Sequence, residues 1–340
     1  MKAKAILSAL FIFIFCVTPA FAKIWRVDNN ATILNAGDFT TLQKAVDAAA
    51  DGDTIYVFGS STTYEGITLS KKFSIFGPGF FLNENPGTSV RLVSAQIYQN
   101  GLTFDTGSEG SFISGLHFPS DINIKVNNII IKRNLVNTIT LSKDISNINI
   151  LQNYINGDIN VGENNNNIII SNNSGRNINI GAKNNDILIS NNNLNSINSG
   201  SISSILIITN NLIYSGINVY NSTLDNNILC AGNFTGTGNS YRNNLGNSTQ
   251  FGTLDGNQSS IDVSKVCIDT GSTDGKKKLA VNSPALKAGT GGTDIGMFGG
   301  SNPYVLSGIP EIPLIYYFTG SATGTDTRSL EIHLKGKSVR

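Results

Sequence analysis

The sequence predicts an all-β solenoid, in which one short unit of strands repeats and stacks on copies of itself. Asparagines recur every 19 residues, each after a short aliphatic run, at Asn134, Asn153, Asn172, Asn191 and Asn210. Within those runs one aliphatic position keeps the same spacing, at Ile131, Ile150, Ile169, Leu188 and Ile207. A second polar position does so too, at Asn128, Asn147, Asn166, Asn185 and Ser204. A fixed period of this length is typical of coils that contact only their neighbours.

Residues 1–22 are interpreted as a cleaved secretory signal peptide. Lys2 and Lys4 give a positive start, a mostly apolar stretch follows, and Ala20-Phe21-Ala22 is a small-x-small cleavage site. Cys16 would suit a lipoprotein, but Phe15 stands where a lipobox has a small residue. The apolar stretch is too short for a stable anchor, and no later stretch is long enough to span a bilayer. We therefore expect an exported protein, secreted or at the cell surface, with no transmembrane segment.

The composition limits the kinds of molecule that the protein is expected to bind. The formal net charge is +1 and only 14% of residues are charged, so the chain has no basic stripe for nucleic acid. Cys230 and Cys267 remain after cleavage. An exported protein can form a disulfide between them, and two separate buried thiols explain them equally well.

Residues 23–53 are predicted to form a strand and a capping helix. The strand covers residues 23–27. In residues 39–50 Leu42, Ala45, Val46 and Ala49 have helical spacing, with Asp38 as the N-cap and Gly52 as the stop. A helix at this place would cover the first coil, which otherwise exposes an unpaired edge.

Residues 54–304 are predicted to form a parallel β-helix. It begins with a buried strand at 54–58 and short strands at 67–69, 73–77, 90–93, 102–104 and 112–118. Alternating isoleucine and asparagine then indicate half-buried strands with isoleucine inward. A second strand per coil recurs at Ile139/Leu141, Ile159/Val161, Ile178/Ile180 and Ile217/Val219.

The abundance of asparagine has two interpretations. Asparagine-rich tracts are often disordered. Here the isoleucine phase persists over five units, which favours order. Stacked about 4.8 Å apart, asparagine side chains form amide ladders, and asparagine tolerates the left-handed backbone of sharp corners. We therefore expect an asparagine ladder at the turns.

The last part of the chain is less regular. Residues 257–278 are expected to leave the coils and carry Asp262, Asp269 and Asp274. Glycine and proline in residues 282–304 indicate tight turns that close a last coil. Residues 305–340 are expected to form C-terminal strands around a polar loop, capping the far end of the solenoid.

Two segments resemble a known group of proteins. DFTTLQKAVDAAADGDTIYV resembles the opening segment of right-handed parallel β-helix proteins of the pectin-lyase-like superfamily, and NSPALKAG…TDIGMFGG resembles the closing segment of its secreted bacterial members. The resemblance covers about residues 27–304 and implies a right-handed parallel β-helix. It does not imply one activity, because the superfamily includes pectate lyases, polygalacturonases, adhesins and phage tailspikes.

The sequence offers no catalytic residue or metal ligand set of the kinds that the resemblance implies. Lyases of the superfamily hold Ca²⁺ with several acidic residues near an Arg or Lys base. Asp158 and Asp186 are out of phase with the coil, and Arg133 and Arg176 fall in different columns. Glu163 is expected to stack on Asp144, as a weak cation site, or on Lys143, as an exposed ion pair.

Hydrolases of the superfamily need clustered aspartates, and no Asp-Asp pair exists here. His117 and His333 are interpreted as structural, and Asp294 as a turn cap. We expect no cofactor, although Asp262, Asp269 and Asp274 would form a Ca²⁺ site if they converged.

The remaining candidate is the surface. Rows of asparagine amides pair donors and acceptors in a way that suits sugar hydroxyls. Tyr154, Tyr214 and Tyr220, with Tyr241, are candidate stacking faces for sugar rings, and packing at corners also explains them. We predict an exported, non-catalytic module, structural or carbohydrate-binding. The alternative is a polysaccharide lyase or glycoside hydrolase acting on a uronic-acid-type polysaccharide.

Overall fold

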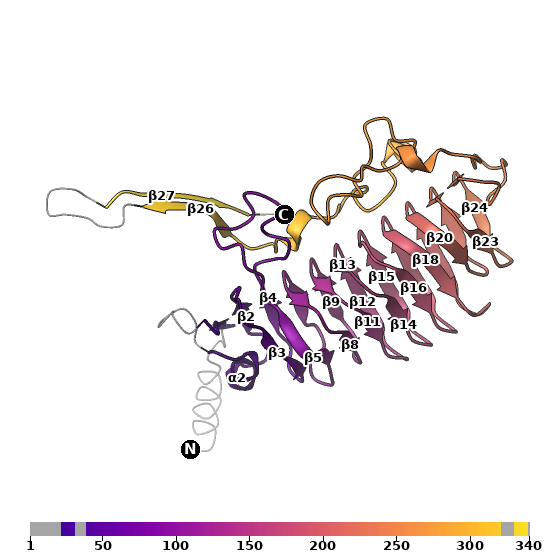
Figure 1. Cartoon of the computed structure of the whole chain (residues 1–340). Helices are drawn as coiled ribbons and strands as arrows, with labels where there is room; N and C mark the ends of the chain where they lie inside the picture. Colours follow the sequence, from indigo (N-terminus) through magenta and orange to yellow (C-terminus); the bar gives the residue numbers. More distant parts are fainter. Residues whose placement is uncertain (1–21, 31–38, 321–329, 339–340) are drawn as a thin grey trace, which may run out of the picture.

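Parallel strands stack along one axis to form a β-solenoid of about ten coils (Figure 1). This computed structural model describes residues 22–30, 39–320 and 330–338. The predicted all-β solenoid is confirmed, and its right-handedness stays a prediction. Almost all of the predicted signal peptide, residues 1–21, lies outside the described residues, as does Asp38. In the described ranges no helix has both the length and the apolar character needed to cross a membrane.

Two large sheets form the long walls of the solenoid. Sheet A has 11 strands in the order β1 (Ile24–Val27), β2 (Thr54–Val57), β4 (Ser74–Phe76), β6 (Phe112–Ser114), β9 (Ile129–Lys132), β12 (Ser146–Leu151), β15 (Asn166–Ser171), β17 (Asn185–Ser190), β19 (Leu206–Thr209), β21 (Thr223–Asp225) and β24 (Ser240–Arg242). Sheet B also has 11 strands, namely β3 (Tyr64–Leu69), β5 (Ile97–Phe104), β8 (Ile122–Ile124), β11 (Ile139–Leu141), β14 (Ile159–Val161), β16 (Asn177–Ile180), β18 (Asn193–Ser199), β20 (Leu212–Asn218), β22 (Ile228–Leu229), β23 (Asn233–Thr235) and β25 (Leu245–Gly246).

A narrow third sheet has one strand after each of the sheet A strands β6, β9 and β12, beyond a sharp corner. Its strands are β7 (His117–Phe118), β10 (Leu135–Val136) and β13 (Tyr154–Ile155), paired in parallel. Single bridges from Tyr154 to Ser174 and from Ser174 to Asn193 continue this ladder into β18. Each coil in this part of the solenoid therefore has three parallel segments.

The inward side chains of successive coils superpose in one continuous core. In sheet A Ile131 pairs with Ile150, and Ile150 pairs with Ile170. The predicted column is therefore wrong from its third member onward. Ile169, Leu188 and Ile207 pair with one another on the outer face, where Ile207 is 49% exposed.

The asparagine ladder is confirmed, with a correction to its members. The eight asparagines are Asn134, Asn153, Asn173, Asn192, Asn211, Asn227, Asn244 and Asn257. The side-chain oxygen of each from Asn153 onward accepts from the backbone N–H of its predecessor, 2.8–2.9 Å away. Asn153 and Asn173 are 20 residues apart, not 19, so the predicted Asn172, Asn191 and Asn210 lie one residue early.

The second predicted column is also one residue out of phase. Asn147 donates to the Asn128 side chain, and the next member is Asn167 rather than Asn166. The buried row at this corner is instead Asn165, Asn184 and Ser204. Asn165 N donates to Asn184 Oδ1, and Asn184 N donates to Ser204 Oγ.

The residue before each of the first seven ladder asparagines turns the corner. These seven residues have φ between 53° and 58°, in the left-handed region, and are Arg133, Gln152, Asn172, Asn191, Asn210, Asn226 and Asn243. We call them the corner column. Asparagine reaches this conformation at low cost. This explains why the predicted 19-residue column still contains asparagines although it lies one residue early. In the preceding coil Gly115 has φ 75°, and a Cβ there would lie 2.5 Å from the Gly77 carbonyl oxygen.

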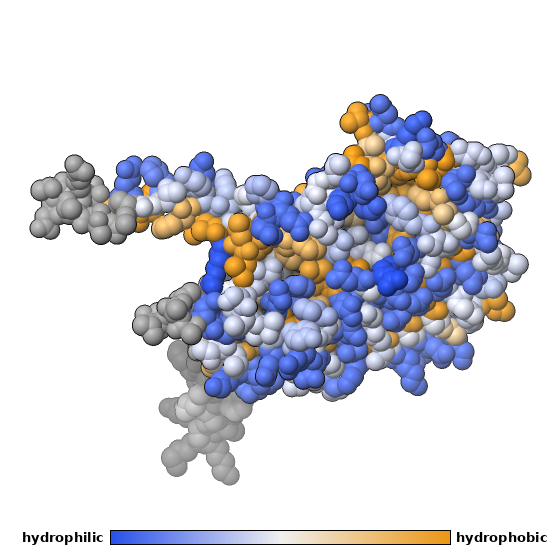
Figure 2. Space-filling model, viewed as in Figure 1, coloured by the Kyte–Doolittle hydropathy of each residue, from blue (hydrophilic) through white to orange (hydrophobic). Residues whose placement is uncertain are grey.

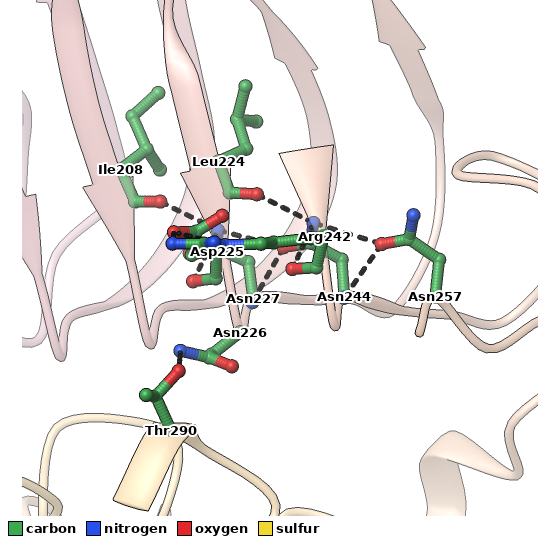
Figure 3. Close-up of polar contacts among 9 residues, drawn as sticks. All are labelled: Ile208, Leu224, Asp225, Asn226, Asn227, Arg242, Asn244, Asn257 and Thr290. Atoms are coloured by element: carbon green, nitrogen blue, oxygen red, sulfur yellow. Dashed lines mark hydrogen bonds and ion pairs between the residues drawn. The ribbon is translucent and has the colours of Figure 1, made fainter. Parts of the chain in front are cut away.

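Residues 290–311, the return segment, run back along the corner column toward the N-terminal coils. Asn226 Nδ2 donates to Thr290, as Figure 3 shows, while Asn227, Asn244 and Asn257 form the ladder beside it. At the other end Arg133 Nη1 donates to the Ile309 carbonyl 3.0 Å away, and Arg133 pairs with Glu311 at 3.2 Å. The prediction that this part of the chain closes a last coil is therefore wrong. It contains the short 3₁₀ turns η2 (Thr290–Gly292) and η3 (Leu306–Gly308), and η1 (Val263–Lys265) precedes it.

The helix of the N-terminal region is shorter than predicted. Helix α2 covers Leu42–Ala48, and Thr41 is its N-cap, because the Thr41 hydroxyl accepts from Lys44 N at 3.4 Å. The helix ends at the cap residue Ala49, before Gly52. Leu42, Ala45 and Val46 are buried against the core.

The C-terminal strands form an antiparallel hairpin of β26 (Leu314–Gly320) and β27 (Ile332–Lys337), as predicted. The hairpin does not cap the far end. Val90 N donates to the Ile315 carbonyl and Lys337 Nζ to the Gly87 carbonyl, so it lies beside the first coils (Figure 1). Apolar residues gather where it joins the body (Figure 2). Residues 90–93, predicted as a strand, are irregular.

Candidate functional site

A polar cleft of about 320 Å³ lies between the narrow sheet and the loop 268–278. Tyr154, Ser174 and Asn193 form its floor, since they are bridged partners on three successive coils. Arg176 flanks the floor, and Lys276 and other residues of the loop form the opposite wall. The solenoid fixes one side of this cleft, and a loop without repeats forms the other.

Asn193 carries an unsatisfied acceptor at the floor of the cleft. The residue is 7% exposed, and its Nδ2 donates to Ser174 Oγ at 3.3 Å. Its Oδ1 is buried and has no hydrogen-bond partner among the described residues. A buried carbonyl oxygen left without a donor costs about 1–3 kcal/mol.

Tyr154 gives the floor an aromatic surface. Its ring packs edge-on against Phe81, with ring centroids 5.4 Å apart. Burial raises the pKa of Tyr154, and the charges of Asp274 and Glu84 raise it further. The hydroxyl therefore stays protonated over the physiological range and can donate a hydrogen bond.

Three cations and two carboxylates line the cleft. Arg176 and Lys276 are exposed, whereas Lys277 Nζ lies over the Tyr214 ring, 5.1 Å from its centroid. Asp269 is exposed. Asp274 is buried and already accepts hydrogen bonds from Asn85 Nδ2, Tyr304 Oη and Ser307 N. The mouth of the cleft thus presents the donors of Arg176 and Lys276 together with the Asp269 carboxylate.

The three predicted stacking tyrosines are not brought together. Tyr154 lines the cleft. Tyr214 packs against a small core with Cys230 and Cys267, beneath Lys277, so its ring is not an open platform. Tyr220 is half-buried and does not line the cleft. The interpretation as corner packing therefore describes Tyr214 better than sugar stacking does.

Tyr241, the fourth tyrosine considered, lines a larger open cavity of about 790 Å³ at the end of sheet A. Its ring meets Phe234 and Phe251 with centroids 5.2 Å and 6.2 Å apart. Arg242 also lines this cavity, and its guanidinium is held by Asp225 at 3.0 Å (Figure 3).

The outer face of sheet B carries a row of polar side chains. Asn160, Asn179 and Asn198 are register partners on successive coils. Asn179 Nδ2 donates to Asn160 Oδ1 at 2.9 Å, and Asn198 Nδ2 donates to Asn179 Oδ1 at 3.4 Å. Within the row Asn160 accepts, Asn179 both accepts and donates, and Asn198 donates, so polar groups such as Asn198 Oδ1 are left for solvent or a ligand.

The acidic residues considered for Ca²⁺ have separate roles. Asp262 accepts from Ser264 N and pairs with Lys265, while Asp269 lies in the cleft and Asp274 lies beneath the return segment. Throughout ranges 22–30, 39–320 and 330–338, no group of three or more His, Cys, Asp or Glu side chains could hold a metal.

The other singled-out charges serve the fold. Asp144 N donates to the Glu163 carbonyl, and the Asp144 carboxylate pairs with Lys143 at 3.5 Å, so the exposed ion pair of Lys143 is with Asp144 rather than with Glu163 as expected. Asp294 caps a turn by accepting from Lys287 N, as predicted. His117 is a half-buried member of the narrow sheet, and His333 pairs with Glu331 on the hairpin.

The cleft contains groups that the sequence did not single out for binding. Asn193, Lys276 and Lys277 were not candidates, and Arg176 was considered only as a base. The run Lys276-Lys277-Lys278 was a visible signal. No repeat in the sequence predicts that the chain places this run beside the narrow sheet.

Comparisons with protein-family models, with curated proteins and with solved structures find no match to this chain.

Proposed function

We propose that this protein is a non-catalytic carbohydrate-binding solenoid that holds a saccharide unit in the Tyr154 cleft. The observation that carries the proposal is the buried, unpartnered Asn193 Oδ1 on the same floor as an aromatic ring. A sugar unit has what this floor lacks, since its hydroxyls can donate to Asn193 and its C–H face can pack on Tyr154.

The rim of the cleft supports the same ligand. Arg176 and Lys276 have donors at the mouth that suit sugar oxygens, and Asp269 can accept from hydroxyls. The cleft volume of about 320 Å³ is at the small end of ligand sites, which fits one or two sugar units.

We further propose that the chain is an exported, right-handed β-helix protein of the pectin-lyase-like group. The stacked coils, the buried asparagine ladder and the opening and closing motifs support this assignment. We also propose that helix α2 caps the first coil, because its buried face packs on strands β1 and β3 at that end.

The second candidate function is a lyase or hydrolase acting on a uronic-acid-type polysaccharide. It is favoured by one observation, the presence of Arg176 and Lys276 beside a polar cleft, where they would neutralise a uronate carboxylate. Lyase action would release an unsaturated sugar that absorbs ultraviolet light, whereas binding alone would not.

Binding measurements on the intact protein test the proposal. A glycan array and affinity electrophoresis with neutral and acidic polysaccharides identify a ligand, and calorimetry then gives its Kd. We expect Tyr154→Ala and Asn193→Ala each to weaken binding about 10-fold, the equivalent of one lost contact of about 1.4 kcal/mol. Tyr220→Ala and Asn198→Ala are matched controls that should bind as the parent does.

Three results would count against the proposal. No retention on any polysaccharide would contradict carbohydrate binding. Equal losses in the control variants would place the ligand elsewhere. Accumulation of an unsaturated product, lost in Arg176→Gln, would favour the enzyme instead.

A further inference from the structure

Cys230 and Cys267, both free thiols in this structure, share a small core between the last coils and the loops that follow them. Cys230 comes directly after β22 and is 5% exposed, in a cluster with Leu212, Ile228, Leu245 and Val266. Cys267 is half-buried and packs against the same cluster. The two residues belong to different parts of the architecture, because Cys230 is in the solenoid and Cys267 is at the start of the loop 268–278.

Cys267 also marks the base of that loop. It is bridged to Leu279 in antiparallel fashion, so the loop between them leaves and returns at one point. Cys267 Sγ donates to the Lys277 carbonyl at 3.6 Å. Tyr214, from strand β20, packs on the same core beside both cysteines. Whatever fixes Cys267 therefore fixes the base of the wall of the cleft.

The surroundings of the two thiols differ in a way that orders their reactions. Burial, and to a smaller extent the nearby Cys267, raise the pKa of Cys230 to about 12. Burial raises the pKa of Cys267 as well, but Lys277 and the Tyr214 hydroxyl oppose the change. Because thiolate is the attacking species, Cys267, which is also the more exposed, is the first to react.

We propose that Cys230 and Cys267 form a disulfide that staples the outer wall of the cleft to the last coils, with a small-molecule disulfide as oxidant. Cys267 thiolate attacks the oxidant, forming a mixed disulfide and releasing one thiol. Cys230 then loses its proton and attacks Cys267 Sγ in that mixed disulfide, releasing the second thiol. Two protein thiols are oxidised to one disulfide, and one oxidant disulfide is reduced to two thiols.

The disulfide should stabilise the part of the protein that the sheets do not hold. The loop 268–278 and the return segment follow Cys267 in the chain and have no sheet pairing with the solenoid. A covalent link at Cys267 restricts the unfolded chain between residues 230 and 267, so the oxidised protein should melt several degrees higher.

The intact chain is incubated with oxidised glutathione and compared with a sample kept in reductant. We expect non-reduced peptide mapping to recover Cys230 and Cys267 in one linked peptide, with Cys16 mapped separately. We also expect the oxidised sample to melt at a higher temperature than the reduced sample. In Cys230→Ser and Cys267→Ser the two samples should melt alike, apart from any glutathione adduct.

Two results would overturn the inference. The first is recovery of both residues as free thiols after oxidation of the folded protein. The second is a glutathione adduct that persists on Cys267 in the parent chain, because it would show that Cys230 cannot reach it. The test needs no saccharide, so its outcome is independent of the proposed function.

Discussion

A buried asparagine is tolerated in the ladder because its amide is fully used. Asn192 N and Nδ2 donate to Asn211 Oδ1, and Nδ2 also donates to the Ile170 carbonyl. Its Oδ1 accepts in turn from Asn173. Each ladder residue therefore satisfies backbone groups that the corner takes out of the sheet pairing, and its desolvation is compensated.

Replacement of Asn192 by alanine should cost at least about 2 kcal/mol of unfolding free energy. The change leaves the buried Asn173 N–H and the Ile170 carbonyl oxygen without this partner, and each unsatisfied group costs about 1–3 kcal/mol. Chemical denaturation measures the loss. Asn198→Ala, on the outer row of sheet B, is the control and should change the value by about 0.5 kcal/mol or less. Equal losses at the two positions would contradict the structural role of the ladder.

His117 should make the protein less stable in mild acid. Burial lowers its pKa from 6.5 to about 4 in the folded state. The unfolded chain therefore binds the proton more readily, so stability is full above about pH 6.5 and falls as the pH drops toward 4. Between pH 7.5 and pH 5 the loss should be about 1–2 kcal/mol. The carboxylates with lowered pKa, such as Asp53, remain ionised in this window.

Denaturant titrations at pH 7.5 and pH 5 check this expectation. His117→Gln cannot be protonated, so the pH dependence in that window should largely disappear. His333→Gln is the control, since His333 is exposed on the hairpin, and it should keep the parent behaviour. An unchanged slope in His117→Gln would refute the assignment.

The error in residue phase has a simple physical origin. Asparagine occupies both the ladder position and the corner position before it. The coil from Asn153 to Asn173 has 20 residues, so a strict period of 19 moves from the ladder position to the corner position and still falls on asparagine. Outward isoleucines hide the same shift, because Ile169 is as hydrophobic as the inward Ile170. The abundance of asparagine predicted the ladder. Where two asparagines or two isoleucines are adjacent, however, the sequence does not show which of them faces inward.

At the scale of the strand, the phase can be tested on adjacent residues of β15. Ile170 is fully buried, and Ile170→Ala should cost about 2–5 kcal/mol because it leaves a cavity in the stacked core. Ile169 lies on the outer face, and Ile169→Ala should cost about 1 kcal/mol or less. Denaturant melts of the two variants give the comparison. The reverse order would restore the frame predicted from the sequence.

The return segment is an element that the repeat could not reveal. Many of its hydrogen bonds come from side chains of the corner column, which lie at coil spacing, but its own residues have no period. Gln152 Nε2, for example, reaches the carbonyls of Asn302 and Pro303. Glycine and proline in residues 282–304 correctly indicated tight turns. They could not show that the turns follow the outside of the solenoid.

Arg133 should hold the far end of this segment in place. Its guanidinium is buried and donates to Gln152 Oε1 and to the Ile309 carbonyl, beside Glu311. In Arg133→Met we expect amide hydrogens of residues 302–311 to exchange at least about 10-fold faster, with the coil strands unchanged. Arg242→Met removes an exposed pair with Asp225, worth about 0–1 kcal/mol, and is the control. Unchanged exchange in residues 302–311 would show that other contacts hold the segment.

At the scale of the whole molecule, the chain builds the solenoid outward and then returns along its corner. The outward path follows repeated local chemistry, which is why the sequence predicted it. The cleft arises only where the returning chain covers the narrow sheet, so its site depends on contacts between residues far apart, such as Tyr154 and the loop 268–278. Such contacts have no signature in a single sequence.

This architecture predicts that two truncations have very different effects. A chain ending after residue 313 loses the hairpin but keeps the pairing of Arg133 with Glu311, so its melting temperature should fall by only a few degrees. A chain ending after residue 289 loses the return segment, uncovers Phe80 and removes the contacts of Arg133 with the Ile309 carbonyl and Glu311. Because newly exposed apolar surface and lost buried hydrogen bonds are both costly, this chain should melt far lower or fail to fold. Circular dichroism melts decide between these outcomes, and similar melting of both chains would mean that the solenoid is stable without its returning end.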